Sequence, residues 1–505
     1  MNAPETILAI DQSTSATKSI VFDTRGNALD RFAIEHAPIY PQSGFVEHDA
    51  EELWRNTQSV IRQAIARYPS TACLSISNQR ETFVIFDRVS GKPLHNAVVW
   101  QCRRGDEICA RLIRDGKADL VSRKTGLKID SYFSASKLTA LLQENPGLRQ
   151  KLNSGEALFG TIDTYLLYRL TAGRVYATDS TNACRTLLYN INTLAWDAEL
   201  CELFDVPINA LPEVRDSAAV FGHCDAGAVG VTIPIAGIMG DSQAALFAHG
   251  CFDPGDAKVT IGTGSSVLLN TGADCPASGV RTLARTHNGV PTYCLEGIVS
   301  YSAATITWLR DKLGLIQSAG ETEAAARAVT DNGGVYLVPA FVGLSAPHWS
   351  PDARAAIVGL SAASSRNHII RAALEAIVYQ IKDALDSMRS QIDRPLNCLR
   401  VDGGASSNTF VTQFLADITG TTITVADSSD FSPRGAAFLG MLGLGIHTSL
   451  DQLRTLGGEH TVFTPQMPRN IADALCAGWQ TAVRQVLAGT ENGSSSEANR
   501  ASSQH

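Results

Sequence analysis

The chain has 505 residues, 44% of them hydrophobic, which supplies enough apolar surface for two domain cores. Its 50 acidic and 42 basic residues give a net charge of −8, which argues against a nucleic-acid partner. The eleven cysteines form no C-x-x-C pair and no apolar run is long enough to cross a membrane, so we expect a cytoplasmic protein without a membrane anchor. The opening MNAPETILAIDQ lacks the basic start of a signal peptide.

The first elements in the chain predict a hairpin. Ile7 to Ile10 is an apolar strand, DQSTSATK is a polar turn, and Ser19 to Phe22 is a second strand. Helical spacing of apolar residues follows at Glu51 to Ala66 and Asp106 to Arg114. Further strands are predicted at Cys73 to Ser77 and Val98 to Trp100.

The second half repeats this design. Lys258 to Ile261, the turn GTGSS and Val267 to Leu269 predict another hairpin, and Asn367 to Gln391 has the pattern of a long amphipathic helix. Strands mixed with helices in both halves indicate an α/β fold with a duplicated unit. We place one domain at 1–252, a second at 253–488, and a disordered tail at 489–505, where apolar side chains are scarce.

Three strand-to-turn junctions could handle phosphate, although no P-loop lysine motif occurs. They are Asp11 with the hydroxyl-rich turn after it, the GTGSS turn at Gly262 to Ser266, and VDGGASSN at Val401 to Asn408. In each, small residues let backbone N–H groups approach an anion. The ordinary alternatives are a strand end at Asp11, a simple hairpin at GTG, and a helix cap at Asn408.

Five separated segments resemble the glycerol kinases, in the FGGY carbohydrate kinase branch of the actin, hexokinase and Hsp70 superfamily. They are YPQSGFVEHDAEELW (Tyr40 to Trp54), SNQRETF (Ser77 to Phe83), NAVVWQCRR (Asn96 to Arg104), GDSQAALFAHG (Gly240 to Gly250) and APHWSPDARAAIVGL (Ala346 to Leu360). The resemblance implies two actin-like (ribonuclease H-like) domains separated by a deep cleft. It also implies ATP-dependent phosphorylation of glycerol, with a homodimer or homotetramer as the expected assembly.

Residue roles follow from the same resemblance. The polyol-binding set it implies is Arg80, Glu81, Trp100, Tyr132 and Asp241, with Asp241 as the catalytic base. We also expect Ser242, which follows Asp241, to contact the substrate. The ATP-binding set it implies is Asp11, Ser13, Thr14, Ser15, Lys18, Thr263, Gly264, Ala303, Thr307, Gly404 and Asn408. Asp11 is expected to hold Mg²⁺ beside the phosphates, since Mg²⁺ prefers a few carboxylates together with phosphate oxygens.

The side chains suit a triol. Carboxylates can accept from hydroxyls, Arg80 and Tyr132 can donate, and Trp100 can cover the carbon chain. Each also has an ordinary interpretation. Arg80 and Glu81 could be a surface charge pair on a strand, Trp100 could be a core residue, and Asp241 could cap a helix.

Four positions depart from the family pattern. Ser13 replaces a glycine, where a positive φ would be strained, and Lys18 replaces an arginine. Ser242 and Ser266 replace a glutamine and a phenylalanine, which enlarges the expected pocket. The alternative substrate is therefore a four-carbon polyol or ketose such as erythritol or erythrulose. The loop GAVGVTIPI and the segment FTPQMPRN lack the residues used for fructose 1,6-bisphosphate and zinc-bridged regulation, so we expect neither control.

Two other classes of protein are less consistent with the sequence. A nucleotide-gated scaffold would share the hairpins but has no need of the polyol-binding set. A nicotinamide dehydrogenase would need a Rossmann glycine turn after a strand, which is missing from this sequence.

Overall fold

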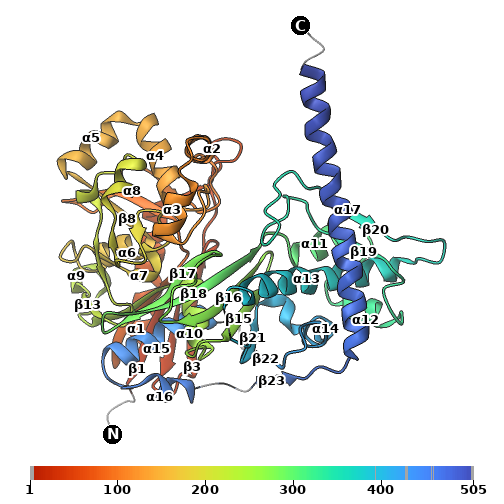
Figure 1. Cartoon of the computed structure of the whole chain (residues 1–505). Coiled ribbons are helices and arrows are strands. Elements are labelled where there is room, and N and C mark those ends of the chain that lie inside the picture. Colours follow the sequence, from red (N-terminus) through yellow and green to blue (C-terminus); the bar gives the residue numbers. More distant parts are fainter. Residues whose placement is uncertain (1–4, 393, 427–429, 457, 459, 502–505) are drawn as a thin grey trace. The chain divides into compact units, whose positions relative to one another are not determined.

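The computed structural model describes residues 5–501 except 393, 427–429, 457 and 459, with the backbone alone for 490–501. It divides into two compact units. The first comprises 1–253, 270–295 and 430–457, and the second comprises 254–269, 296–429 and 458–505. Both mix strands and helices, as the sequence predicts (Figure 1). Each unit is discontinuous in sequence, so the single boundary at 252/253 and the cleft between the domains stay predictions.

The first unit is built on a six-stranded sheet. In spatial order its strands are β13 (Val220–His223), β14 (Pro234–Gly240), β5 (Thr71–Asn78), β1 (Thr6–Gln12), β2 (Ala16–Asp23) and β3 (Ala28–Glu35). β1 and β2 form the predicted hairpin, and β1 pairs in parallel with β5, which pairs in parallel with β14.

Alternation along β1 places helices on both faces of this sheet. Leu8 and Ile10 pack in a core with α1 (Ala50–Arg67) and α6 (Ile162–Leu170). Ile7 and Ala9 pack in another core with α10 (Asp241–Ala248) and α15 (Phe431–Gly443). All seven residues of β1 are buried, as expected of a strand covered on both faces.

A smaller sheet and short helices complete the first unit. The sheet runs β4 (Glu47–His48), β7 (Ala97–Val98), β6 (Phe83–Asp87), β8 (Ala157–Thr161). The remaining helices are α2 (Asp106–Arg114), α3 (Ala118–Thr125), α4 (Ser134–Glu144), α5 (Pro146–Ser154), α7 (Ser180–Ala183), α8 (Ala198–Leu203), α9 (Ala226–Val229) and α16 (Leu450–Arg454). The short ladders pair β9 (Ala177–Asp179) with β12 (Glu213–Arg215), and β10 (Tyr189–Asn190) with β11 (Ala195–Trp196). The longer strands β17 (Arg281–His287) and β18 (Val290–Val299) pair antiparallel.

The second unit begins with the other predicted hairpin. β15 (Asp256–Ile261) pairs antiparallel with β16 (Ser265–Gly272) and parallel with β21 (Cys398–Asp402). The ladder continues through β22 (Ile423–Ala426) and β23 (His460–Phe463). Together with β17 and β18 these strands belong to a seven-stranded sheet in the order β17-β18-β16-β15-β21-β22-β23. The other elements are β19 (Tyr336–Val338), β20 (Ala356–Val358), α11 (Ala304–Asp311), α12 (Glu321–Arg327), α13 (Arg366–Arg389), the 3-10 helix η2 (Gly404–Ser407), α14 (Thr409–Thr419) and α17 (Arg469–Ala501).

The disordered tail expected at 489–505 stays a prediction, and the structure describes only part of this segment. α17 continues to Ala501, so the structure gives residues 489–501 a helical backbone, while 502–505 lie outside the described residues. Among the described residues, none of the helices has both the length and the apolar character that crossing a membrane requires.

A buried acid in the first unit makes its stability depend on pH. Asp163 of α6 is fully buried and accepts a hydrogen bond of 2.6 Å from the hydroxyl of Thr178. Burial raises the pKa of Asp163 to about 7, and the neighbouring Asp179 acts in the same direction. The unfolded chain releases this proton near its ordinary pKa, so the stabilisation is present at low pH and is lost as pH rises to about 7.

We therefore predict that Asp163→Asn removes this loss, because the amide oxygen still accepts from Thr178 while carrying no charge. The melting temperature of the variant minus that of the wild type should rise by roughly 2–4 °C between pH 5 and pH 8, measured by thermal denaturation. A difference that stays constant over this range would show that Asp163 does not bind a proton in the folded state.

Candidate active site

The carboxyl ends of three parallel strands lie at one edge of the first sheet. The register places Gln12 of β1 opposite Asn78 of β5, and Asn78 opposite Gly240 of β14. Asp11 comes one residue before Gln12, Arg80 comes two residues after Asn78, and Asp241 comes directly after Gly240. The sheet therefore brings together residues that are far apart in the sequence, at an edge where α/β proteins commonly bind ligands.

Asp11 lies in the first predicted phosphate turn. One carboxylate oxygen is 3.1 Å from the Nζ of Lys18, and the other accepts from Ser77 at 3.3 Å. Burial raises the pKa of Asp11, while the charge of Lys18 acts in the opposite direction. The structure places Asp11 near the end of β1 and Lys18 opposite it on β2, so the ion pair joins the two strands of the hairpin next to the turn.

The turn itself accommodates Ser13 without strain. Ser13 does not adopt a positive φ. Its N–H and its hydroxyl both donate to the carbonyl of Ala16, at 3.0 and 2.9 Å. Ser15 accepts from the N–H of His36 at 3.0 Å. A serine in place of the family's glycine therefore causes no backbone strain at position 13.

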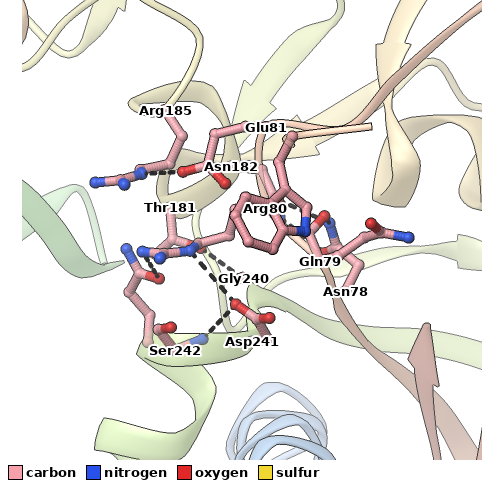
Figure 2. A network of polar contacts seen from close by, with 12 residues as sticks. Asn78, Gln79, Arg80, Glu81, Thr181, Asn182, Arg185, Gly240, Asp241 and Ser242 are labelled. Atoms are coloured by element: carbon pink, nitrogen blue, oxygen red, sulfur yellow. Dashed lines mark hydrogen bonds and ion pairs between the residues drawn. The ribbon is translucent and has the colours of Figure 1, made fainter. Parts of the chain in front are cut away.

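Arg80 and Asp241 form an ion pair, with Nε and Oδ1 3.4 Å apart (Figure 2). Arg80 also donates to the amide oxygen of Gln243 at 3.2 Å. Asp241 is the first residue of α10, whose N-cap is Gly240, so its interpretation as a helix cap is wrong. Its side chain keeps 36% exposure while that of Arg80 keeps 5%, which leaves the carboxylate accessible and the guanidinium buried behind it.

Glu81 forms an ion pair with a different arginine, Arg185. Its carboxylate accepts from the Nε of Arg185 at 2.6 Å, and both side chains are almost completely buried (Figure 2). Glu81 has a φ of +62°, and its carbonyl accepts from Ser134 at 2.8 Å. The interpretation of Arg80 and Glu81 as a surface pair on a strand is wrong, since both are buried in the turn between β5 and β6.

The two predicted aromatic residues lie against each other. The ring centroids of Trp100 and Tyr132 are 5.3 Å apart and the planes are inclined by 60°. The indole N–H of Trp100 donates to the hydroxyl of Thr14 at 3.0 Å, which links this pair to the phosphate turn. Trp100 is only half-buried, so it is not an ordinary core residue.

A buried lysine supports the aromatic pair. The Nζ of Lys137 donates to the carbonyls of Ser131, Tyr132 and Trp100 at 2.7, 2.6 and 3.3 Å. Burial lowers the pKa of Lys137 to about 8. Three carbonyl acceptors thus compensate much of the cost of burying this ammonium group.

The second unit contains a cavity of about 390 Å³. Five of the predicted nucleotide residues line it: Thr263, Ala303, Thr307, Gly404 and Asn408. Its apolar wall includes Ile306, Leu374, Ile377 and Val411, a surface suited to a flat heterocycle. Arg310 and Glu323 add charged groups at the same cavity.

Two glycines that are sequence neighbours of lining residues allow a close approach of backbone segments. Gly403 has a φ of +96°, and a Cβ there would lie 2.5 Å from the carbonyl oxygen of Ile261. Gly264 is not a lining residue; a Cβ there would lie 2.7 Å from the oxygen of Val299. Asn408 caps α14 through the N–H groups of Phe410 and Val411, so its capping role and its place at the cavity coexist.

Sequence reasoning missed Arg185 and Lys137. The partner of Arg185 is 104 residues away, which no local pattern reveals. Lys137 offered one signal, a single cation in the otherwise uncharged stretch SASKLTALL. Ser242 lies in α10 and Ser266 in β16, in different units, so the enlarged pocket stays a prediction. In the described part of the chain, no group of three or more His, Cys, Asp or Glu residues could hold a metal ion.

Comparisons with known proteins cover both units. The N-terminal domain of the FGGY family of carbohydrate kinases matches residues 6–248, and the C-terminal domain matches 257–444. A glycerol kinase of Shewanella amazonensis is 46% identical over 488 residues, which is 95% of this chain and 99% of the relative. A glycerol kinase of Desulfitobacterium hafniense is 46% identical over 489 residues, again 95% and 99%.

Solved structures agree. The crystal structure of Plasmodium falciparum glycerol kinase with ADP has a TM-score of 0.92 and 36% identity, covering 96% of this chain and 98% of that one. A xylulose kinase of Lactobacillus acidophilus has a TM-score of 0.87 at 21% identity, covering 96% and 98%, and supports the fold alone. The predicted fold of two actin-like α/β domains is confirmed. The chain belongs to the FGGY family of carbohydrate kinases.

Proposed function

We propose that this protein transfers the γ-phosphate of ATP to glycerol, forming glycerol 3-phosphate and ADP. The observation that carries the proposal is the accessible carboxylate of Asp241, held by the buried guanidinium of Arg80 at the carboxyl edge of the sheet. Relatives named glycerol kinase at 46% identity over nearly the whole chain support the choice of acceptor.

The polyol is bound by complementary hydrogen bonds. Glu81 and Asp241 accept from hydroxyls, Arg80 and Tyr132 donate, and the ring of Trp100 covers the carbon chain. Ion pairs to Arg185 and Arg80 hold the two carboxylates in place before the substrate arrives. Such preorganisation lowers the entropy cost of orienting a small flexible molecule.

Asp241 acts as the catalytic base. It accepts the proton of the attacking hydroxyl while that oxygen forms a bond to the γ-phosphorus. The bond from the γ-phosphorus to the β–γ bridging oxygen breaks, and ADP leaves. In phosphoryl transfer the positioning of the nucleophile and the stabilisation of charge outweigh early proton removal, so the main contribution of Asp241 is orientation.

ATP uses the cavity of the second unit. The adenosine moiety rests on the apolar wall with Gly404 and Asn408 nearby, and Thr263 and Gly264 face the phosphates with their backbone N–H groups. In the first unit, Asp11, Ser13, Thr14, Ser15 and Lys18 supply further phosphate contacts. A bound Mg²⁺ would neutralise phosphate charge, and the buried carboxylate of Asp11 with its polar surroundings fits one of its ligands.

Three further properties belong to this proposal. None of the eleven cysteines, all of which lie in the described residues, forms a disulfide, which supports a reducing, cytoplasmic location. A homodimer or homotetramer remains the expected assembly. We also predict that fructose 1,6-bisphosphate does not inhibit the enzyme through the loop 227–235. Likewise, we predict no zinc-bridged regulator at the segment 463–470.

The choice of acceptor is tested by a substrate panel. We predict that kcat/KM for glycerol exceeds that for erythritol and erythrulose by about tenfold or more, since accommodating or rejecting one carbon unit is typically worth 10- to 200-fold. Coupled measurement of ADP formation with each polyol reads this out. A higher kcat/KM with a four-carbon substrate would reassign the enzyme within its family, and ADP formation that ignores every polyol would refute acceptor phosphorylation.

The role of Asp241 is tested by Asp241→Asn. We predict that kcat falls by roughly 100-fold or more, while the polyol KM changes only a few-fold, because the amide keeps the shape but orients the attacking hydroxyl less firmly than a carboxylate and cannot take its proton. Arg80→Ala should impair both parameters, since it removes a substrate donor and the partner of Asp241.

The matched control is Asp225→Asn, which removes a carboxylate 2.9 Å from Arg174 at the N-cap of α9. Asparagine remains a good cap, so this variant should keep wild-type kinetics. Near-normal turnover of Asp241→Asn would remove Asp241 from the reaction.

A further inference from the structure

A short buried segment lies directly behind the carboxyl edge of the sheet. It begins at Asp179, the last residue of β9, and continues through α7, which carries Thr181 and Asn182. All three side chains are fully buried. None of them belongs to the polyol-binding or nucleotide-binding sets, and we refer to these three residues as the α7 brace.

Asp179 organises the brace. Its carboxylate accepts from the backbone N–H groups of Thr181 and Asn182 at 3.0 and 2.9 Å, and from the hydroxyl of Thr181 at 2.8 Å. It also accepts from the hydroxyl of Ser217 at 2.7 Å and the side-chain amide of Asn182 at 2.9 Å. A buried carboxylate with this many donors fixes the rotamers of its neighbours, because moving any of them would leave a buried polar group unpaired.

Thr181 and Asn182 of the brace form hydrogen bonds with the ends of β14 and β5 (Figure 2). The hydroxyl of Thr181 donates to Asp179 and accepts from the N–H of Gly240 at 2.9 Å. Gly240 is the N-cap of α10, directly before Asp241. Asn182 and Asn78 exchange two side-chain hydrogen bonds, of 2.9 and 3.1 Å, at the end of β5 before Arg80.

We infer that Thr181 is a positioning residue for the reaction: held by Asp179, it fixes the N–H of Gly240 and thereby the carboxylate of Asp241. Asn182 does the same for the strand end that carries Arg80. The inference rests on the proposed function, since it assigns Asp241 the role of base. Threonine suits position 181 because one hydroxyl must donate to a carboxylate and accept from an amide at once.

The decisive variant is Thr181→Val, which keeps the shape of the side chain and loses the hydroxyl. Thr181→Ser restores the hydroxyl and serves as the rescue. Thr178→Val is the matched control: it also removes a buried threonine hydroxyl from a buried carboxylate, here Asp163 at 2.6 Å. A longer hydrogen bond of this hydroxyl, at 3.4 Å, goes to the backbone carbonyl of Asp179 and not to the carboxylate that organises the brace. No side-chain hydrogen bond of Thr178 in the described structure reaches Gly240, Asn78 or a predicted site residue.

The first measurement is hydrogen exchange at the Gly240 amide, which does not depend on activity. Exchange should be about tenfold faster in Thr181→Val than in Thr178→Val, because only the former loses the acceptor of this N–H. Equal exchange rates in the two variants would show that the Thr181 hydroxyl does not hold Gly240, and would overturn the inference.

The second measurement separates positioning from stability. In Thr181→Val, kcat should fall by about tenfold, equivalent to about 1.4 kcal/mol, with polyol KM within about twofold of wild type. Thr181→Ser should recover most of kcat, and Thr178→Val should keep kcat even if its melting temperature falls as far. A kcat in Thr181→Val no lower than in Thr178→Val would overturn the inference.

These assays use whichever polyol the wild-type enzyme phosphorylates best. A wild type that phosphorylates no polyol refutes the proposed function, whereas an active wild type with an unaffected Thr181→Val refutes the inference alone.

Discussion

The register of three parallel strands is the constraint on which the first unit depends. Gln12, Asn78 and Gly240 are register partners in β1, β5 and β14. The chain segments that follow these residues therefore leave the sheet side by side at the same edge. A slip of one residue in any pairing would turn Asp11, Arg80 or the start of α10 toward the other face of the sheet. The cores on the two faces prevent this slip, because Leu8 and Ile10 pack with one set of helices and Ile7 and Ala9 with the other.

Backbone register alone brings the residues together but does not orient their side chains. Orientation comes from buried polar contacts: Arg185 holds Glu81, Lys137 holds the carbonyls of the aromatic pair, and the α7 brace holds Gly240. Each of these groups is costly to bury unless its partners are in place, so each contributes more to a single well-defined site than to net stability. In the second unit, the close packing of Gly403 against the backbone of Ile261 fixes the turn that precedes Gly404.

Much of the fold was predictable from local patterns. Both hairpins follow from apolar runs around polar turns, and α2 has the predicted bounds because its apolar positions recur at helical spacing. The site was less accessible. The surface-pair interpretation of Arg80 and Glu81 assumed a continuous strand, whereas β5 ends at Asn78 and Glu81 takes a positive φ. Thr181 and Arg185 act on partners 59 and 104 residues away, and single-sequence patterns carry no such information.

The central claim is that Asp241 is effective because the brace holds the backbone before it. A double-variant cycle in kcat with Thr181→Val and Asp241→Asn tests this most directly. If Thr181 acts through Asp241, its substitution costs little once the carboxylate is gone, and the double variant should match Asp241→Asn within about twofold. A double variant slower than Asp241→Asn by the full factor that Thr181→Val shows in the wild type would mean that the two residues act independently, and would contradict this account.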